Sequence, residues 1–329
     1  MKNLIIASLV SCLFAGTLVS RIDAQTQQET RKRTPAIAST SLPDGISTKD
    51  VTFYSEGIQC HGRIFLPRGF GADSKIPAVV VAPGWGKIES SVESFANRFA
   101  VAGLVAMTID YRGWGQSGGF LQTVDEVKTD DRLRFSQMTT RVRIRRKRLI
   151  PQHQILDIRN ALYYLQGEPG VDRARVGVWG TGMAGGHVIV IAATDARVKA
   201  VVADSPIIDG KDTPRKASSL TGAMLKADQR RARSNREVDQ AGGLNDVETR
   251  LALSSYHPFW YVDQVPKTTA VLFVTSVTDV KGTENTQAAA KRLAGPTDVV
   301  QLPAGMGLSS GKSIDAASKA AADWFLKHL

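Results

Sequence analysis

The run VGVWGTGMAGG, residues 176–186, has the residue types of a nucleophile turn at every position except the central one. An apolar strand is predicted to lead into a tight glycine turn and then a helix, the context in which a Gly-x-Ser-x-Gly pattern exposes a serine for acyl transfer. The strained turn lifts that hydroxyl above the sheet, where a histidine can take its proton. In this chain the motif reads Gly180-Thr181-Gly182-Met183-Ala184. Gly182 therefore keeps the turn and removes the nucleophile.

Five other segments occur in a fixed order along the chain. They are PAVVVAPGWG (77–86), LVAMTIDYRGWGQSGG (104–119), DIRNALYYLQGEPGVDRARVGVWG (157–180), LFVTSVTD (272–279) and AADWFLKHL (321–329). In content and order they resemble the α/β-hydrolase superfamily, and within it the branch of dienelactone-hydrolase-like and Xaa-Pro-peptidase-like esterases. The resemblance implies an α/β fold with a mostly parallel central sheet, helices on both faces and a helical cap insertion.

The resemblance also assigns the other parts of a catalytic triad. Asp279, in SVTDVKG, matches the triad acid, and residues 83–86 match the loop whose backbone helps to bind an oxyanion. The triad histidine is expected in the loop 302–313, which contains no histidine, and we interpret Gly307 as its approximate vacated position. Without serine and histidine, only the small catalysis due to the oxyanion hole and to binding is expected to remain.

Several of these candidates have ordinary structural explanations as well. A loop aspartate such as Asp279 commonly caps backbone N–H groups. His187, on the helix after the turn, is expected to pack between helix and sheet and not to face the crevice. His257 could reach a ligand, although the proline that follows it equally indicates packing. Ser205 and Thr181 lie close to the vacated site, but the sequence identifies no adjacent base for either hydroxyl.

The crevice at the carboxyl ends of the strands is the expected ligand site of an open α/β sheet. Aromatic residues with few polar groups suit a small molecule, although core packing explains them as readily. Asp110, Asp204 and Asp279 fall at strand ends, but no histidines nearby complete a metal site, so we expect no metal and no cofactor. The predicted ligand-binding residues are Gly84, Trp85, Gly86, Tyr111, Trp114, Thr181, Met183, Ser205 and His257.

The elements that position these residues follow from hydrophobic periodicity. Strands are predicted at 51–55, 59–66, 78–82, 105–110, 198–203, 269–275 and 299–302, and helices at 90–102, 151–165, 187–193, 285–293 and 314–327. Strands that alternate with helices predict one parallel-rich sheet covered on both faces. The polar, helix-prone segment at about 206–258 is expected to form the cap.

The N-terminus predicts export. Residues 1–24 combine a basic residue at Lys2, an apolar run and a small residue at Ala24, which is typical of a signal peptide and not of a membrane span. We expect a flexible leader at 25–46, an α/β domain at 47–329 and no transmembrane span in the mature chain. Lipid attachment at Cys12 is the less favoured alternative. Removal of the signal leaves Cys60 alone, which excludes an internal disulfide.

The net charge of +11 is concentrated in two stretches. These basic segments could contact an anionic glycan, lipid or nucleic acid. We favour a solvated helical face, because neither segment carries a nucleic-acid motif or interleaved aromatics. The first contains Arg132, Arg134, Arg141, Arg143, Arg145, Arg146, Lys147 and Arg148, and the second contains Lys226, Arg230, Arg231, Arg233 and Arg236.

Three functional hypotheses follow. The first is an exported hydrolase-fold protein with a degenerate triad, which binds an ester, acyl or other small ligand in the crevice or presents the fold to a partner. The second is an enzyme that acts through non-standard residues of the same crevice, such as a lyase or isomerase with Asp279, Asp204 or His257 as base. The third is residual esterase activity through Ser205 or Thr181.

Overall fold

Small and β-branched apolar side chains form the interior strands of an eight-stranded sheet. β3 (Ile76–Ala82), β4 (Val105–Ile109), β7 (Val171–Thr181), β8 (Val198–Asp204) and β9 (Ala270–Ser276) are largely buried, as expected for parallel strands covered on both faces. With β1 (Ser47–Ser55), β2 (Ile58–Leu66) and β10 (Thr297–Leu302) the order is β1-β2-β4-β3-β7-β8-β9-β10. β2 pairs antiparallel with β1 and β4, and all other neighbouring pairs are parallel.

The computed structural model describes residues 42–127, 132, 134–212, 220–233, 247–303 and 311–329. Residues 42–329 belong to one compact unit. The predicted signal peptide, Cys12, most of the predicted leader and Gly307 lie outside the described residues. Among the described helices, none has the length and the apolar composition that crossing a membrane requires.

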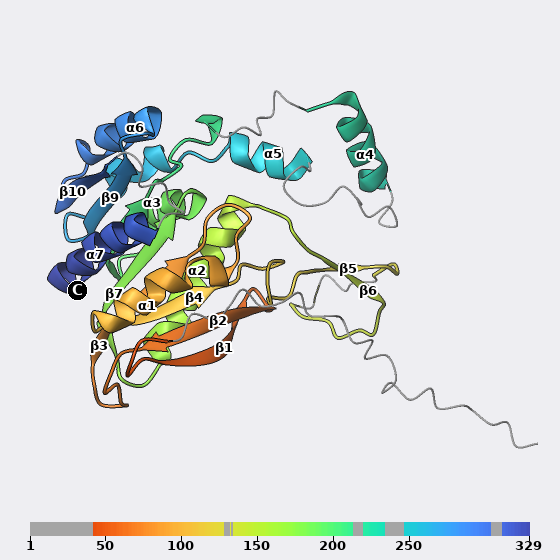
Figure 1. Cartoon of the computed structure of the whole chain (residues 1–329). Coiled ribbons are helices and arrows are strands. Elements are labelled where there is room, and N and C mark those ends of the chain that lie inside the picture. The colour runs from red at the N-terminus through yellow and green to blue at the C-terminus, as the bar shows by residue number, and fades with distance from the viewer. Residues whose placement is uncertain (1–41, 128–131, 133, 213–219, 234–246, 304–310) are drawn as a thin grey trace, which may run out of the picture. The chain divides into compact units, whose positions relative to one another are not determined.

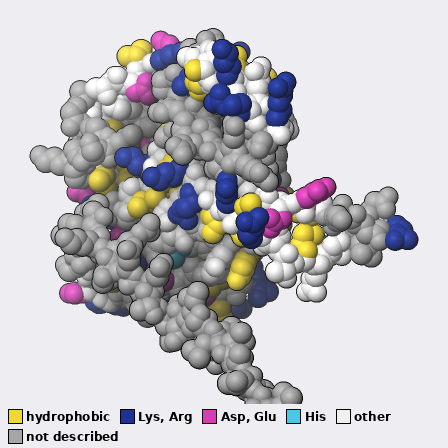
Figure 2. All heavy atoms as spheres, turned by 90° about the vertical axis from the view of Figure 1, so that its right-hand side faces the viewer, with side chains coloured by type: hydrophobic (Ala, Val, Ile, Leu, Met, Phe, Trp, Pro, Cys, Tyr) yellow, Lys and Arg dark blue, Asp and Glu magenta, His cyan; other side chains and the backbone are white. Residues whose placement is uncertain are grey.

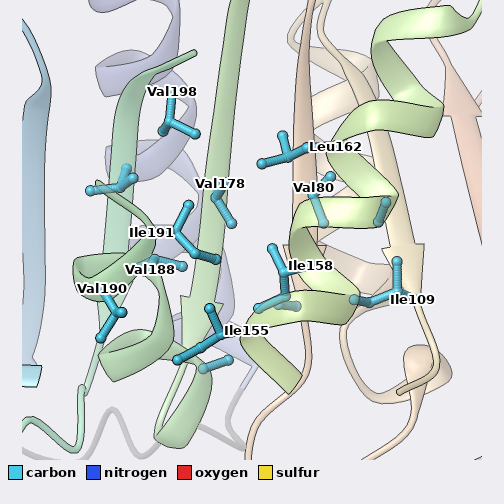
Figure 3. Packing of buried hydrophobic residues seen from close by; sticks show 14 of the residues in the cluster. Val80, Ile109, Ile155, Ile158, Leu162, Val178, Val188, Val190, Ile191 and Val198 are labelled. Atoms are coloured by element: carbon cyan, nitrogen blue, oxygen red, sulfur yellow. The ribbon is translucent and has the colours of Figure 1, made fainter. Parts of the chain in front are cut away.

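Four helices cover the two faces of the sheet (Figure 1). α2 (Pro151–Gly167) and α3 (Met183–Thr194) pack on one face, and α1 (Glu93–Val101) and α7 (Gly311–His328) pack on the other. α6 (Val280–Ala290) lies against β9 and β10. Figure 3 shows the core between the sheet and the helices α2 and α3. Its members include Val80 and Val178 of the sheet, Ile158 and Leu162 of α2, and Val188 and Ile191 of α3. These layers confirm the predicted fold class.

The predicted opening hairpin is present, and its turn contains two residues with positive φ. Glu56 (φ 49°) and Gly57 (φ 77°) join β1 to β2. Positive φ at both central residues is what a two-residue type I′ turn needs. The strands of this hairpin extend four residues and one residue, respectively, beyond the N-terminal limits that the sequence predicted.

Two helices begin earlier than periodicity predicted. α3 starts at Met183, directly after the turn glycine. α6 starts at Val280, because the side chain of Asp279 accepts a hydrogen bond from the Gly282 N–H at 2.9 Å and caps the helix. The first turns of both helices contain glycine, a weak helix former, so residue type alone did not reveal them. In contrast, α1 begins later than predicted, after a short 3₁₀ turn, η1 (Glu89–Ser91).

A two-stranded antiparallel arm, β5 (Phe120–Thr123) and β6 (Val142–Arg145), includes part of the first basic segment (Figure 1). The expectation of a helical face is therefore wrong for residues 142–145, whose sequence Val-Arg-Ile-Arg has the period of two typical of a strand. Leu121 pairs with Ile144, and Thr123 pairs with Val142, so these side chains share one face. The three apolar members of this face are exposed.

The segment predicted as a cap contains η2 (Gly210–Asp212), α4 (Gly222–Arg233) and α5 (Val247–Ser254). η4 (Pro258–Gln264) then returns the chain to the core. Glu248 of α5 forms ion pairs with Arg145 at 3.0 Å and Arg148 at 2.5 Å, which link α5 to the end of the arm. On the side of the molecule shown in Figure 2, Lys and Arg side chains are interspersed with hydrophobic ones.

Candidate functional site

The turn between β7 and α3 has the backbone of a nucleophile turn without a side chain at its centre. Gly182 adopts φ 58° and ψ −115°, a conformation that glycine tolerates much better than other residues. A Cβ placed on Gly182 would meet no described atom within 4 Å. The position therefore has open space in the direction where a serine would project its hydroxyl.

Two glycines allow neighbouring backbone segments to approach this turn closely. A Cβ on Gly180 would lie 2.4 Å from the main-chain oxygen of Ala184, and a Cβ on Gly84 would lie 2.9 Å from that of Thr181. Both glycines are needed because the β7 turn contacts its own helix on one side and the loop after β3 on the other. The loop predicted to bind an oxyanion thus lies directly against the turn that contains Gly182.

A cavity of about 510 Å³ opens beside the turn, and we call it the elbow cavity. Its volume is that of a typical small-molecule site, and its walls are mainly apolar. Met183 is the first residue of α3, so its N–H has no partner within the helix and the positive end of the helix dipole lies at the turn. The residues that line the cavity are Gly84, Trp85, Lys87, Ser91, Val92, Phe95, Thr181, Gly182, Asp204 and Ile314.

Asp204, the last residue of β8, is one of the residues that line this cavity, and its side chain is fully buried. Its Oδ1 accepts a hydrogen bond from the Ser205 hydroxyl at 3.1 Å, whereas its Oδ2 has no hydrogen-bond partner in the described part of the chain. Burial raises the pKa of Asp204 to about 7, and the bond from Ser205 opposes this shift. A carboxyl group with such a pKa can hold or release a proton near neutral pH.

Four of the residues predicted from sequence meet at the elbow cavity: Gly84, Trp85, Thr181 and Gly182. The others lie apart from its lining. Tyr111 is buried and donates its hydroxyl hydrogen bond to the Pro83 carbonyl at 3.1 Å, and Trp114 donates Nε1–H to the Arg148 carbonyl at 3.2 Å. Met183 is buried in the core beneath the turn. Gly86 and Ser205 are each next to or near a lining residue in sequence but are not in the lining.

His257 lies at a second, smaller cavity of about 250 Å³, between α2, α3 and η4. Its Nδ1 is 2.9 Å from Asp209 Oδ1, and its Nε2 is 3.1 Å from the Ser254 carbonyl. Since each ring nitrogen faces an oxygen acceptor, neither is available to take a proton from a ligand. His257 and Trp260 also stack, with ring centroids 4.1 Å apart.

His187 is fully buried on α3, in agreement with the expected packing between helix and sheet. Its Nδ1 is 2.8 Å from the Tyr256 hydroxyl, and its Nε2 is 3.0 Å from Gln154 Oε1. A neutral ring that donates from Nε2 can accept at Nδ1 from the Tyr256 hydroxyl, whose single proton is also within reach of the Met183 carbonyl at 3.2 Å. Burial lowers the pKa of His187 to about 3, which fits this neutral state.

Asp279 is exposed at the N-terminus of α6, where it serves as the capping residue described above. Gly307, the interpreted histidine position, lies outside the described residues. Among the residues that the structure describes, no group of three or more His, Cys, Asp or Glu side chains is arranged to hold a metal ion.

Sequence reasoning missed part of the cavity wall. Val92 and Phe95 fall within the helix predicted at 90–102, and Phe95 packs on Trp179, with ring centroids 4.3 Å apart. Lys87 and Ser91 belong to no motif, and Ile314 comes from the distant helix α7. Asp204 is predicted from sequence as a carboxylate at a strand end and as a candidate base, but not as a residue of the cavity lining.

Comparison with known proteins identifies the family of this fold. The model of the acetyl xylan esterase (AXE1) family matches residues 35–211, more than half of the chain. The chain belongs to the acetyl xylan esterase family. Membership of this family confirms the α/β-hydrolase resemblance, and the family match includes β1 through β8, the turn at Gly182 and Asp204.

A curated relative of this acetyl xylan esterase family member is an uncharacterised 31.7 kDa protein in the traX-finO intergenic region of Escherichia coli. The two are 32% identical over 157 residues, which cover 47% of this chain and 44% of the relative. The match thus spans somewhat less than half of the relative's length.

Solved structures share the fold of this acetyl xylan esterase family member at low identity. The hypothetical protein PA2218 from Pseudomonas aeruginosa has a TM-score of 0.68 at 18% identity, covering 88% of this chain and 95% of that chain. A dienelactone hydrolase from Anabaena variabilis has a TM-score of 0.54 at 16% identity, covering 87% and 99%. These likenesses support the fold alone.

Proposed function

We propose that this family member binds a small, mainly apolar molecule in the elbow cavity and does not carry out serine-dependent ester hydrolysis. The observation that carries the proposal is Gly182: the turn has the backbone of a nucleophile position, and its side chain is a hydrogen atom. Hydrolysis through an acyl-enzyme needs an oxygen nucleophile at this point, with a base in reach. The same glycine leaves space beside the cavity that a ligand can use.

The absence of a histidine between residues 302 and 313 supports the proposal from an independent position in the sequence. A serine restored by chance at residue 182 would still lack the base that activates it. Asp279 also supports it, since the side chain that matches the triad acid is exposed and caps α6.

A competing function is proton transfer without a serine, as in a lyase or isomerase. Asp204 favours it, because burial raises the pKa of this cavity-lining carboxyl group to about 7, the range of an effective general base at neutral pH. Binding and proton transfer use the same cavity. They differ in whether a bound molecule is converted.

The basic arm adds a proposed contact with an anionic membrane surface. Arg143 is exposed between Val142 and Ile144 in the sequence but on the opposite face of the arm, and Arg141, also exposed, pairs with Asp125. Exposed apolar side chains with an arginine beside them in the same strand suit a surface of anionic lipid headgroups. Stronger retention by phosphatidylglycerol vesicles than by phosphatidylcholine vesicles, reduced in Arg143→Gln, is the expected result. Equal retention by both vesicles would overturn this contact.

Two measurements on the purified chain test the proposed function. The natural chain is expected to hydrolyse p-nitrophenyl acetate no faster than the heat-denatured chain does. Fluorine NMR is expected to show that small fluorinated aromatic molecules bind, and that Gly182→Leu, which projects a side chain toward the cavity, abolishes binding.

Gly57→Leu is a matched control for Gly182→Leu. Gly57 also has a positive φ and no described atom within 4 Å of a built Cβ, but it lies in the β1–β2 turn. Both variants therefore place a side chain at a residue with positive φ, which is strained for residues other than glycine. Clear ester turnover by the natural chain would overturn the loss of hydrolysis, and equal binding by both variants would overturn the elbow cavity as the site.

A further inference from the structure

The carboxyl group of Asp204 is satisfied only in part by the fold. Its side chain is fully buried, and Oδ2 has no hydrogen-bond partner among the described residues. A buried polar atom without a partner costs on average more than a hydrogen bond contributes, so such atoms are uncommon. The orphaned oxygen therefore calls for a partner that the described chain does not provide.

Two other buried carboxylates, those of Asp110 and Asp157, have both oxygens occupied. Asp110 accepts from the Glu89 N–H at 2.9 Å with Oδ1 and from the Gln116 N–H at 2.7 Å with Oδ2. Asp157 accepts from the side chain of Arg112 at 2.8 Å and from its N–H at 3.0 Å. These two residues fix loops of the structure, whereas Asp204, which lines a cavity, bonds one neighbour and has a second oxygen without a hydrogen-bond partner among the described residues.

The backbone after Asp204 also departs from ordinary geometry. Ser205 has φ 45°, which is strained for a residue other than glycine. In this conformation its N–H donates to the Val274 carbonyl at 2.7 Å, and its hydroxyl donates to Asp204 Oδ1. Ser205 thus holds one carboxylate oxygen in place, and the other remains for a different donor.

We propose that Asp204 recognises a hydrogen-bond donor, such as a hydroxyl group, on an otherwise apolar ligand in the elbow cavity. This inference rests on the proposed function and names the polar group of the ligand. The rest of the lining suits the apolar part, because Trp85, Val92, Phe95 and Ile314 form much of the wall. A single buried acceptor in such a wall selects strongly for the ligand that satisfies it.

Few charged groups surround the carboxyl. Lys87 is the one other ionisable side chain among the described residues that line the elbow cavity, and it is exposed. On Asp204's own strand and the neighbouring strands β7 and β9, the adjacent residues Thr181, Ala203 and Val274 are uncharged. Burial accordingly dominates its titration, with a pKa of about 7.

Matched probes test this inference on the full chain. 4-Fluorobenzyl alcohol has a hydroxyl donor, and 4-fluorobenzyl methyl ether has the same ring without it. At pH 8, where the carboxylate is mostly ionised, the natural chain is expected to bind the alcohol about tenfold more tightly, as a hydrogen bond to a charged acceptor allows. At pH 5.5 the preference is expected to vanish, because a protonated carboxyl can donate to the ether oxygen.

Variants identify the responsible group. Asp204→Asn is expected to lose the pH dependence of the preference, since an amide does not titrate in this range. Asp323→Asn, an exposed carboxylate on α7, is the matched control and is expected to behave like the natural chain. A preference that keeps its pH dependence in Asp204→Asn would overturn the inference.

The remaining outcomes separate this inference from the proposed function. Equal binding of both probes at pH 8 leaves the binding function in place and overturns the role of Asp204. Failure of both probes to bind overturns both. Carbon NMR of the natural chain adds a test that needs no variant: a midpoint near 7 for the Asp204 carboxyl is expected, and a midpoint near its ordinary value of 3.8 would overturn the inference.

Discussion

The main-chain carbonyl of Asp204 accepts a hydrogen bond from the N–H of Gly182 at 2.9 Å. This bond joins the end of β8 to the turn after β7. On the other side of the turn, the Gly182 carbonyl accepts a bond from the Ile207 N–H, also at 2.9 Å. Backbone bonds hold the turn from both sides, so its geometry does not depend on the side chain at residue 182.

Gly182→Ser is expected to keep the fold and to lose about 1–3 kcal/mol in the free energy of unfolding, because a residue with a Cβ is strained at this φ. The new serine is expected to remain unlabelled by a fluorophosphonate probe, since the sequence of residues 302–313, where the activating histidine is predicted, contains no histidine. Labelling is expected only in the double variant Gly182→Ser with Gly307→His. Urea unfolding and mass spectrometry of the labelled chain measure these outcomes.

Gly57→Ser provides the comparison for strain alone, because it has a positive φ in an unrelated turn. It is expected to lose a similar amount of stability and to stay unlabelled. Labelling of the natural chain at Ser205 or Thr181 would contradict the proposed loss of serine-dependent hydrolysis. It would identify the labelled hydroxyl as a nucleophile.

Asp204→Asn is expected to change how stability depends on pH. In the folded chain the pKa of Asp204 is raised from its ordinary 3.8 to about 7, so the folded state holds the proton more tightly than the unfolded state. The stabilisation is complete below about pH 4 and is lost as pH rises through 7, amounting to about 4 kcal/mol in total. Relative to the natural chain, the variant should therefore gain stability between pH 4 and pH 8.

Urea unfolding at several pH values measures this difference. Burial raises the pKa of Glu89 to about 7 as well, so the natural chain and Asp204→Asn both retain that contribution. Asp323→Asn is expected to follow the natural chain at every pH. A constant difference between Asp204→Asn and the natural chain from pH 4 to pH 8 would show that Asp204 titrates normally.

The sequence was sufficient to predict the turn but not the state of Asp204. Local patterns identify the strand, the glycines and the helix around Gly182, because each lies within a few residues of the next. The burial of Asp204 depends on β8 lying between β7 and β9, which come from distant parts of the chain. Its environment therefore follows from tertiary packing, and sequence could show only that a carboxylate ends a strand.

His187→Gln is expected to make the free energy of unfolding less dependent on pH below about 6.5. Burial lowers the pKa of His187 to about 3 in the folded chain, against an ordinary value of 6.5, so the unfolded state binds the proton more tightly. Stability is complete above pH 6.5 and falls as pH decreases toward 3, by up to about 5 kcal/mol. Between pH 4 and pH 6, the number of protons taken up on unfolding should decrease by about one in the variant. An unchanged number would mean that His187 is charged in the folded chain.

The arm and Asp279 show a second limit of the sequence. Residues 142–145 alternate as a strand does, but the sequence next to them does not indicate which segment pairs with them. The partner strand, Phe120–Thr123, lies about twenty residues earlier in the chain. For Asp279, which lies beyond the residues of the family match, the resemblance in sequence predicts a triad acid, and the structure shows that its side chain accepts a hydrogen bond from the Gly282 N–H and caps α6. In both cases the structural role of the residue depends on the backbone segment that it contacts, which the sequence pattern does not specify.

Asp157→Asn is expected to lower the free energy of unfolding by about 3–5 kcal/mol, because it removes the buried carboxylate that pairs with Arg112 and leaves this arginine only the exposed carboxylate of Glu56, at 2.6 Å. Arg112 and Asp157 are both almost fully buried, and their closest atoms, Nη2 and Oδ1, are 2.7 Å apart. Asp125→Asn tests an exposed ion pair, that of Asp125 with Arg141 on the arm, and is expected to change stability little. Similar losses in the two variants, measured by urea unfolding, would contradict the view that burial makes the Arg112–Asp157 pair essential. A large loss confined to Asp157→Asn would show that this pair holds the loop after β4 on α2.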